Sequence, residues 1–292
     1  MNTVLPIDRD SGEVSTEEMN KLIDLDRYPI VRIDNKGGQL LVAQCRSDLD
    51  DCAAAMLPKF VRQAAITKMA EEAESLVQVA HRYDGDRVTF YEEDDIGCSD
   101  DESLKSAVRS ARHPNRYCQI LNYQIPNHSD LRAIYLWPPL TEFIRQVLNV
   151  EQLFLSQCPH LALTMKVAYE GDTDGWHYDP NDGVITLVLQ TADNGGEFEY
   201  APNIRNKINQ NYAGVDRLFK SPDVEATRPI LEPGTFTFFN GRHSMHRVRQ
   251  VGSTRQPRIV SIFSFDQRPD HFFAQSYIDK LRRFPQGPPI VD

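Results

Sequence analysis

The pattern of apolar and polar positions changes character near residue 150. Before that point, apolar residues recur at helical intervals, most clearly over residues 60–79 and 130–150. A helix start is predicted at Ser15, because Glu18 follows three residues later, as in a capping box. The first part of the chain is therefore predicted to be mainly helical.

The first 150 residues are predicted in more detail as follows. Residues 48–81 are predicted to form one kinked helix or two, because Pro58 interrupts them. Residues 83–110 carry clusters of acidic residues and are predicted to be a polar surface excursion. Residues 117–125 read as a strand, and the helix over 130–150 is expected to break at Pro138 and Pro139.

After residue 150, short β-rich runs alternate with turn sequences, while residues 206–227 have no clear period and are predicted to be a loop. The predicted strands cover residues 153–156, 161–169, 184–190, 197–200, 234–239 and 258–265. Strands at this spacing, without helices between them, predict an antiparallel sandwich or barrel. We therefore expect an α+β fold in one domain spanning 1–292, in which residues 1–150 support a β core formed mostly by 151–292.

Composition and charge narrow the classes of function. The chain has 292 residues, 40% of them hydrophobic, and its charge is 32 − 42 = −10, which argues against a nucleic-acid partner. It has no apolar run long enough for a membrane helix, and residues 1–15 do not resemble a secretory signal. Five cysteines without a C-x-x-C pair predict reduced thiols in a cytoplasmic protein.

The sharpest chemical feature is His177 followed two residues later by Asp179. In an extended segment both side chains project to the same face, so both can reach one point inside a barrel. His246 lies 246 − 177 = 69 residues further on, after the predicted strand at 234–239. Two imidazoles and one carboxylate form a facial triad, which holds Fe(II) and leaves positions open for a bidentate cosubstrate and O2.

Two assignments around this triad have alternatives. His243 is the rival third ligand, although alternation from Met245 onward places His246, not His243, on the ligand face. A 2-oxo acid bound to the metal needs a cation for its distal carboxylate, and a guanidinium suits this task. Arg258 at the start of the last strand is the first choice, and Arg255 is the second; either could instead be a surface arginine.

The order of these parts, over residues 160–266, resembles the Fe(II)/2-oxoglutarate-dependent oxygenases. The resemblance implies a double-stranded β-helix (jelly-roll, cupin-like) core with N-terminal buttressing helices. A closer resemblance is to the free-amino-acid halogenases, typified by lysine halogenase, and their hydroxylase relatives. It rests on the strings Gly175-Trp176-His177-Tyr178-Asp179, Asn181-Asp182, Leu187-Val188-Leu189-Gln190, Gly195-Gly196-Glu197-Phe198-Glu199-Tyr200, Gly241-Arg242-His243-Ser244-Met245-His246-Arg247-Val248 and Ser264-Phe265-Asp266.

One position separates the two branches of that family. In the halogenating members, glycine replaces the carboxylate ligand and leaves a coordination site for chloride, whereas this chain has Asp179 there. The resemblance therefore implies hydroxylation or a related oxidation of a C–H bond. It also implies Fe(II), 2-oxoglutarate and O2 as cofactor and cosubstrates, with succinate and CO2 as coproducts.

Three residues are candidates for contact with a small-molecule substrate, which the resemblance implies to be an amino acid or a derivative. Arg116 could bind its carboxylate or be a surface arginine. Trp176 could wall the pocket or belong to the core, and Asp182 could meet an ammonium group or cap a turn. Glu197 and Glu199 alternate on a predicted strand and are expected to face solvent.

Two other functions compete with the oxygenase hypothesis. A metallo-hydrolase could use the same three ligands to activate water, and a jelly-roll binding module could retain the fold without the metal. Arg258 favours the oxygenase over the hydrolase, because a hydrolase needs no 2-oxo acid clamp. The substrate, the choice among hydroxylation, desaturation and cyclisation, and the oligomeric state stay open at this point.

Overall fold

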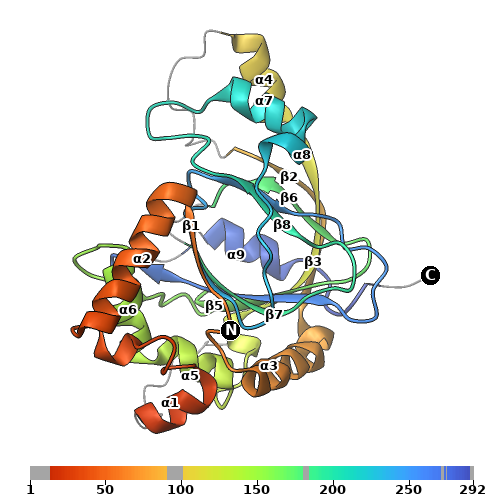
Figure 1. Cartoon of the computed structure of the whole chain (residues 1–292). Helices are drawn as coiled ribbons and strands as arrows, with labels where there is room; N and C mark the ends of the chain where they lie inside the picture. Colours follow the sequence, from red (N-terminus) through yellow and green to blue (C-terminus); the bar gives the residue numbers. More distant parts are fainter. Residues whose placement is uncertain (1–13, 91–100, 180–183, 271–272, 274, 290–292) are drawn as a thin grey trace.

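The computed structural model describes residues 14–90, 101–179, 184–270, 273 and 275–289. A curled antiparallel sheet occupies the centre, and two groups of helices lie on opposite sides of it (Figure 1). The first group consists of α1 (Thr16–Leu22), α2 (Lys36–Cys52), α3 (Gln63–Leu76), α5 (Asp130–Leu136) and α6 (Pro138–Val147). The second consists of α4 (Glu102–Ser110), α7 (Tyr212–Lys220) and α8 (Pro222–Glu225).

The sheet has the strand order β1-β9-β7-β11-β5-β3-β6-β10-β8, with β2 paired to β3. Its strands are β1 (Ala54–Leu57), β2 (His81–Val88), β3 (Arg112–Ile120), β5 (Leu163–Ala168), β6 (Thr173–His177), β7 (Val184–Gln190), β8 (Phe198–Ala201), β9 (Phe236–Phe239), β10 (Met245–Val248) and β11 (Arg258–Phe263). Two short strands, β4 (Phe154–Leu155) and β12 (Phe265–Asp266), pair separately, and α9 (Gln275–Arg282) follows. The architecture is the expected α+β fold with a double-stranded β-helix core.

The main hydrophobic core fills the space between the sheet and the first group of helices. All four residues of β9 are buried, and Phe236 stacks on Phe60 with ring centroids 4.6 Å apart. Phe263 of β11 meets Phe236 edge-on at 5.7 Å. The same core contains Met19 of α1 and Phe265 of β12, so the helical part and the β part are packed together.

Most sequence-based predictions of elements are confirmed. Ser15 and Glu18 form the predicted capping box at the start of α1, and the proline pair separates α5 from α6. Each strand predicted after residue 150 has a counterpart in the structure, displaced by no more than three residues at either end. The strand predicted at 117–125 is displaced to Arg112–Ile120 and is followed by a 3-10 turn at Asn122–Gln124.

Three predictions are wrong. Residues 48–81 are interrupted by strand β1 as well as by a proline, and the preceding helix α2 already begins at Lys36. The stretch 83–110 contains most of β2 and all of α4, although its residues 91–100 lie outside the described part. The predicted loop at 206–227 contains α7, whose Val215 and Leu218 are buried against Trp176 and its neighbours. These elements were missed because their sequences are polar or amphipathic and are stabilised mainly by tertiary packing.

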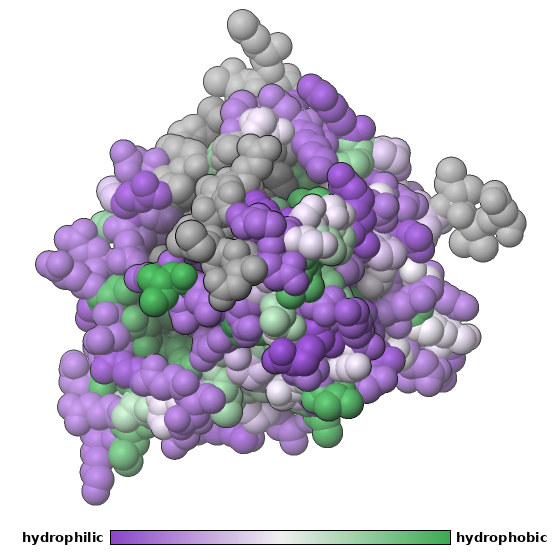
Figure 2. Space-filling model, turned by 90° about the horizontal axis from the view of Figure 1, so that it is seen from above, coloured by the Kyte–Doolittle hydropathy of each residue, from purple (hydrophilic) through white to green (hydrophobic). Residues whose placement is uncertain are grey.

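The surface carries no broad apolar face in the view from above, where hydrophilic residues dominate and apolar ones form small separate patches (Figure 2). Within the described ranges, every helix is too short or too polar to cross a membrane.

We expect Phe236→Ala to lower the free energy of unfolding by about 3–5 kcal/mol, because it leaves a cavity among packed aromatic rings. Urea denaturation followed by circular dichroism would measure this loss. Ile230→Ala is the matched control, since Ile230 is 91% exposed, and its effect should stay near zero. A loss below about 1 kcal/mol for Phe236→Ala would contradict the assignment of this side chain to the core.

Candidate metal centre

The pairing of β6 with β10 brings two histidines together. His177, the last residue of β6, lies directly opposite His246 of β10, and the centroids of their rings are 4.0 Å apart. The register between the strands then shifts, so that Val248 is opposite Asp174 rather than Gly175. The two imidazoles therefore face the same point at the end of the barrel interior.

Each ring is oriented by a hydrogen bond to the backbone two residues earlier. Nδ1 of His177 lies 2.7 Å from the carbonyl oxygen of Gly175, and Nδ1 of His246 lies 3.0 Å from that of Ser244. A carbonyl only accepts, so Nδ1 donates in both rings. In the neutral imidazole this leaves the Nε2 lone pair free for a metal, as in many metal-binding histidines.

Asp179 completes the group just beyond the end of β6. Its Oδ1 lies 3.8 Å from Nε2 of His177, and its Oδ2 lies 3.5 Å from Nε2 of His246. The backbone N–H of Asp179 donates to the carbonyl of Gly241, at 3.0 Å. A Cβ at position 241 would stand 1.8 Å from Oδ2, so only glycine leaves room for the carboxylate in this position.

The donor set fits a divalent metal. The ligand atoms of the three residues lie within 4.8 Å of one another, and Oδ2 of Asp179 is buried without a hydrogen-bond partner among the described residues. Burial raises the pKa of Asp179, but His246 and His177 outweigh it and lower this pKa to about 2. Burial also lowers the pKa of His177 well below its usual value, aided by Arg87 and His246. An anionic carboxylate and neutral imidazoles are the forms that bind metal.

The three side chains face a cavity of about 100 Å³ inside the barrel, and Arg258 lines it as well. Arg258 is only 9% exposed, and its side chain forms no hydrogen bond or ion pair within the part of the chain that the structure describes. Burial lowers its pKa to about 10, so it stays cationic at neutral pH. A buried guanidinium is costly without a partner, and this one is therefore suited to an anionic ligand.

The structure adds two cavity residues that the sequence did not single out. Lys166 of β5 and Asp174 of β6 both line the cavity, and their side chains form an ion pair of 2.6 Å. Only the cross-strand register brings them together, so no local motif could have revealed them. Glu199 is a further correction, since it is fully buried beside Arg247 and Arg228 instead of facing solvent.

The remaining candidates lie in different surroundings. Arg255 is outside the cavity, where its 91% exposed side chain forms a bidentate ion pair with Asp193. Trp176 points away from the cavity into a separate apolar cluster. Arg116 lines the cavity at its rim, with 43% of its side chain exposed. Asp182 lies outside the described residues.

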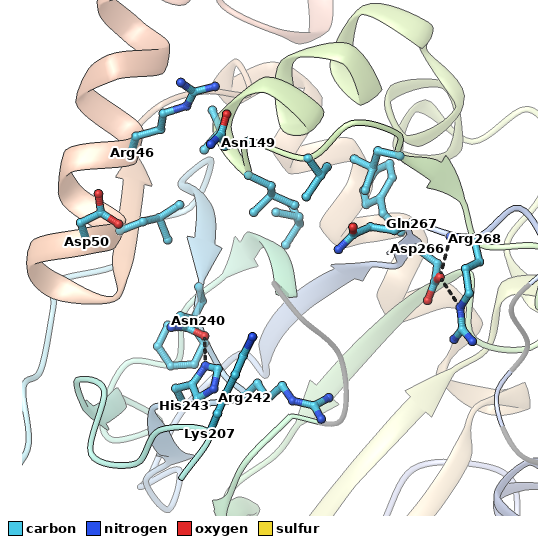
Figure 3. Close-up of a pocket in the computed structure, with 18 residues that line it drawn as sticks. Arg46, Asp50, Asn149, Lys207, Asn240, Arg242, His243, Asp266, Gln267 and Arg268 are labelled. Atoms are coloured by element: carbon cyan, nitrogen blue, oxygen red, sulfur yellow. Dashed lines mark hydrogen bonds and ion pairs between the residues drawn. The ribbon is translucent and has the colours of Figure 1, made fainter. Parts of the chain in front are cut away.

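His243, the rival ligand, lies in a neighbouring pocket of about 1060 Å³ between α2, α6 and the segment after β9 (Figure 3). Its Nδ1 is 3.2 Å from Oδ1 of Asn240. Phe239 lines both this pocket and the metal cavity. His243 is not part of the cluster formed by the three candidate ligands.

Several solved structures share this fold. The non-haem α-ketoglutarate-dependent epimerase SnoN from nogalamycin biosynthesis is 9% identical, with a TM-score of 0.54 over 87% of this chain and 94% of its own. The carbocyclase SnoK from the same biosynthesis is 12% identical, with a TM-score of 0.51 over 89% and 95%. AviO1 from Streptomyces viridochromogenes Tue57 is also 12% identical, with a TM-score of 0.51 over 80% and 97%.

The fold is shared with the two α-ketoglutarate-dependent enzymes, and the cluster of two histidines and one aspartate has the donors of a divalent metal site. The sequence profile of the halogenase D family matches residues 98–276, which is more than half of the chain and includes all three candidate ligands. The chain belongs to the halogenase D family. No curated protein sequence matches it.

We expect His246→Ala to abolish stoichiometric Fe(II) binding, because it removes one of three facial donors, and His243→Ala to leave it intact. Metal content after anaerobic loading and dialysis, measured by inductively coupled plasma mass spectrometry, distinguishes the two variants. The opposite result, in which only His243→Ala loses the metal, would show that the ligand assignment is wrong.

Proposed function

We propose that this protein is a hydroxylase of a small molecule, an amino acid or a derivative, and that its reaction consumes 2-oxoglutarate and O2 and releases succinate and CO2. The observation that carries the proposal is Asp179. Its carboxylate occupies the position that glycine takes in the halogenating relatives, and it faces both histidines. A carboxylate in this position fills the coordination site that chloride would need.

His177, Asp179 and His246 would hold Fe(II), which together with 2-oxoglutarate supplies the oxidising power when bound. The chain's own residues orient the reactants and limit the access of water. The two histidine rings are fixed by backbone carbonyls, and the three side chains are at most 16% exposed. Arg258 would bind the distal carboxylate of 2-oxoglutarate, which a metallo-hydrolase would not require.

Arg116 is the best-placed described residue for the carboxylate of an amino-acid substrate. It lines the cavity but remains partly exposed, and its ion pair with Asp84 is weak because the Asp84 side chain is 64% exposed. A substrate carboxylate that enters the cavity can therefore replace Asp84 as its partner.

Two further proposals concern the domain organisation and the cellular location of the protein. The shared core of the helical and β parts supports one domain over residues 1–292. Cys45, Cys52, Cys118 and Cys158 are all free thiols, as in a protein of the reducing cytoplasm.

We expect Arg258→Ala to raise the apparent KM for 2-oxoglutarate strongly. Loss of a charge-assisted contact in a desolvated cavity costs on the order of 2–5 kcal/mol of binding free energy. The formation of succinate at varied 2-oxoglutarate concentration would measure it. Arg255→Ala serves as the control, because Arg255 is exposed and bound to Asp193. A larger effect from Arg255→Ala would show that Arg255, not Arg258, binds the distal carboxylate of 2-oxoglutarate. No effect from either variant would contradict the proposal that 2-oxoglutarate is the cosubstrate.

The product should carry oxygen and no halogen even in high chloride, because Asp179 fills the coordination site and its negative charge disfavours exchange by an anion. Mass spectrometry of a panel of amino acids, incubated with Fe(II), 2-oxoglutarate and air in chloride or bromide, tests this through product mass and isotope pattern. A halogenated product from the unmodified protein would overturn the hydroxylase proposal.

A further inference from the structure

One wall of the metal cavity carries three charged side chains besides the candidate metal ligands and Arg258. Lys166, Arg116 and Asp174 line this wall, on the neighbouring strands β5, β3 and β6. The Lys166 side chain is 18% exposed, and its ammonium group also lies 4.3 Å from the centroid of the Tyr117 ring. It is thus held in place at the cavity surface by a carboxylate and an aromatic face.

Asp174 is the only described carboxylate lining the cavity apart from the metal ligand, and it already has two cationic partners. Its Oδ2 accepts from Lys166 at 2.6 Å, and its Oδ1 accepts from Arg87 at 2.7 Å. Asp174 is therefore shared between two cations. The wall has no carboxylate available for an ammonium group on a substrate side chain.

A recess of about 460 Å³ adjoins the cavity, and two of its arginines form ion pairs with carboxylates behind it. Arg116 and Thr173 line both spaces, while Arg247, Arg249 and His113 line the recess alone. None of its described lining residues is acidic, but Arg247 pairs with Glu199, and Arg249 lies within 4.0 Å of Glu197, Glu199 and Asp223. His113 is a minor feature of this recess, because mainly burial lowers its pKa, to about 4.

We propose that the substrate carries a second carboxylate, as an acidic amino acid does, and that Lys166 and Arg116 bind its two carboxylates. This inference rests on the proposed function and specifies its substrate class. A basic amino acid would bring an ammonium group next to Lys166 without a compensating anion. An apolar side chain would remove water from Lys166 without replacing its hydrogen bonds. A second carboxylate suits Lys166, which shares Asp174 with Arg87, and Arg116, whose partner Asp84 is exposed.

Two isosteric pairs of ligands test the proposal: L-glutamate against L-glutamine, and L-aspartate against L-asparagine. Each acid has nearly the shape of its amide but carries one more negative charge. Isothermal titration calorimetry without O2, on protein loaded with Fe(II) and 2-oxoglutarate, should show that at least one acid binds about tenfold or more tightly than its amide. L-Lysine should bind more weakly than the acid.

Lys166→Met should reduce the preference for acid over amide to about twofold or less, because it removes the charge while keeping the length of the side chain and leaves Asp174 paired with Arg87. Lys220→Met is the matched control, since Lys220 is 72% exposed, pairs with Asp216 and lies outside the cavity. Its preference should equal that of the unmodified protein. Arg116→Gln gives an independent variant if Lys166→Met does not fold, and it should weaken the binding of the acid.

Equal binding of acids and amides, or tighter binding of L-lysine, would overturn the inference. If the protein then hydroxylates a neutral or basic amino acid, the proposed function stands and only the substrate class is wrong. If 2-oxoglutarate and metal bind but none of the amino acids binds or reacts, the proposed amino-acid hydroxylation fails as well. Hydroxylation of an acid together with loss of preference in Lys166→Met supports both.

Discussion

The site depends on the register between β6 and β10. Side chains on a strand alternate between its faces, so a shift of one residue would turn one histidine away from the cavity. The observed register places His177 opposite His246, and the irregularity that follows moves Asp174 opposite Val248. The same pair of strands therefore positions two candidate metal ligands and the buried carboxylate that holds Lys166.

The charges that line the cavity contrast with the net charge of the chain. The whole chain has a net charge of −10, yet its cavity and the adjoining recess are lined by several cations. Buried charges are costly unless they are paired, and Arg258 has no partner in the described structure. Lys166 and Arg87 both donate to Asp174. Such an interior is stabilised by anions, and 2-oxoglutarate with an anionic substrate would provide them.

The sequence predicted the parts that follow from local periodicity. His177 and Asp179 are two residues apart on an extended segment, and His246 follows a strongly apolar strand, so the ligand set could be proposed without a structure. The strand β1 was missed because Ala54 and Ala55 favour a helix in isolation and form a strand only by pairing with β9. Glu199 was misplaced because its burial depends on arginines from β10 and the segment after α8. Contacts across strands are set by register, which local sequence patterns do not specify.

The fit between Asp179 and Gly241 connects the identity of the ligand to the fold around it. The carboxylate occupies space that any other residue at position 241 would fill, and the Asp179 N–H is held by the Gly241 carbonyl. Loss of this side chain would leave both a gap and one negative charge fewer in a cavity that already has surplus cations. Electrostatics would then favour a small anion beside the metal. The outcome of the reaction would still depend on how the substrate is held, because transfer to carbon requires close and aligned approach. Ligand identity and substrate positioning are therefore separate determinants, and the residues that we propose for the second, Lys166 and Arg116, lie on strands other than those that carry the candidate metal ligands.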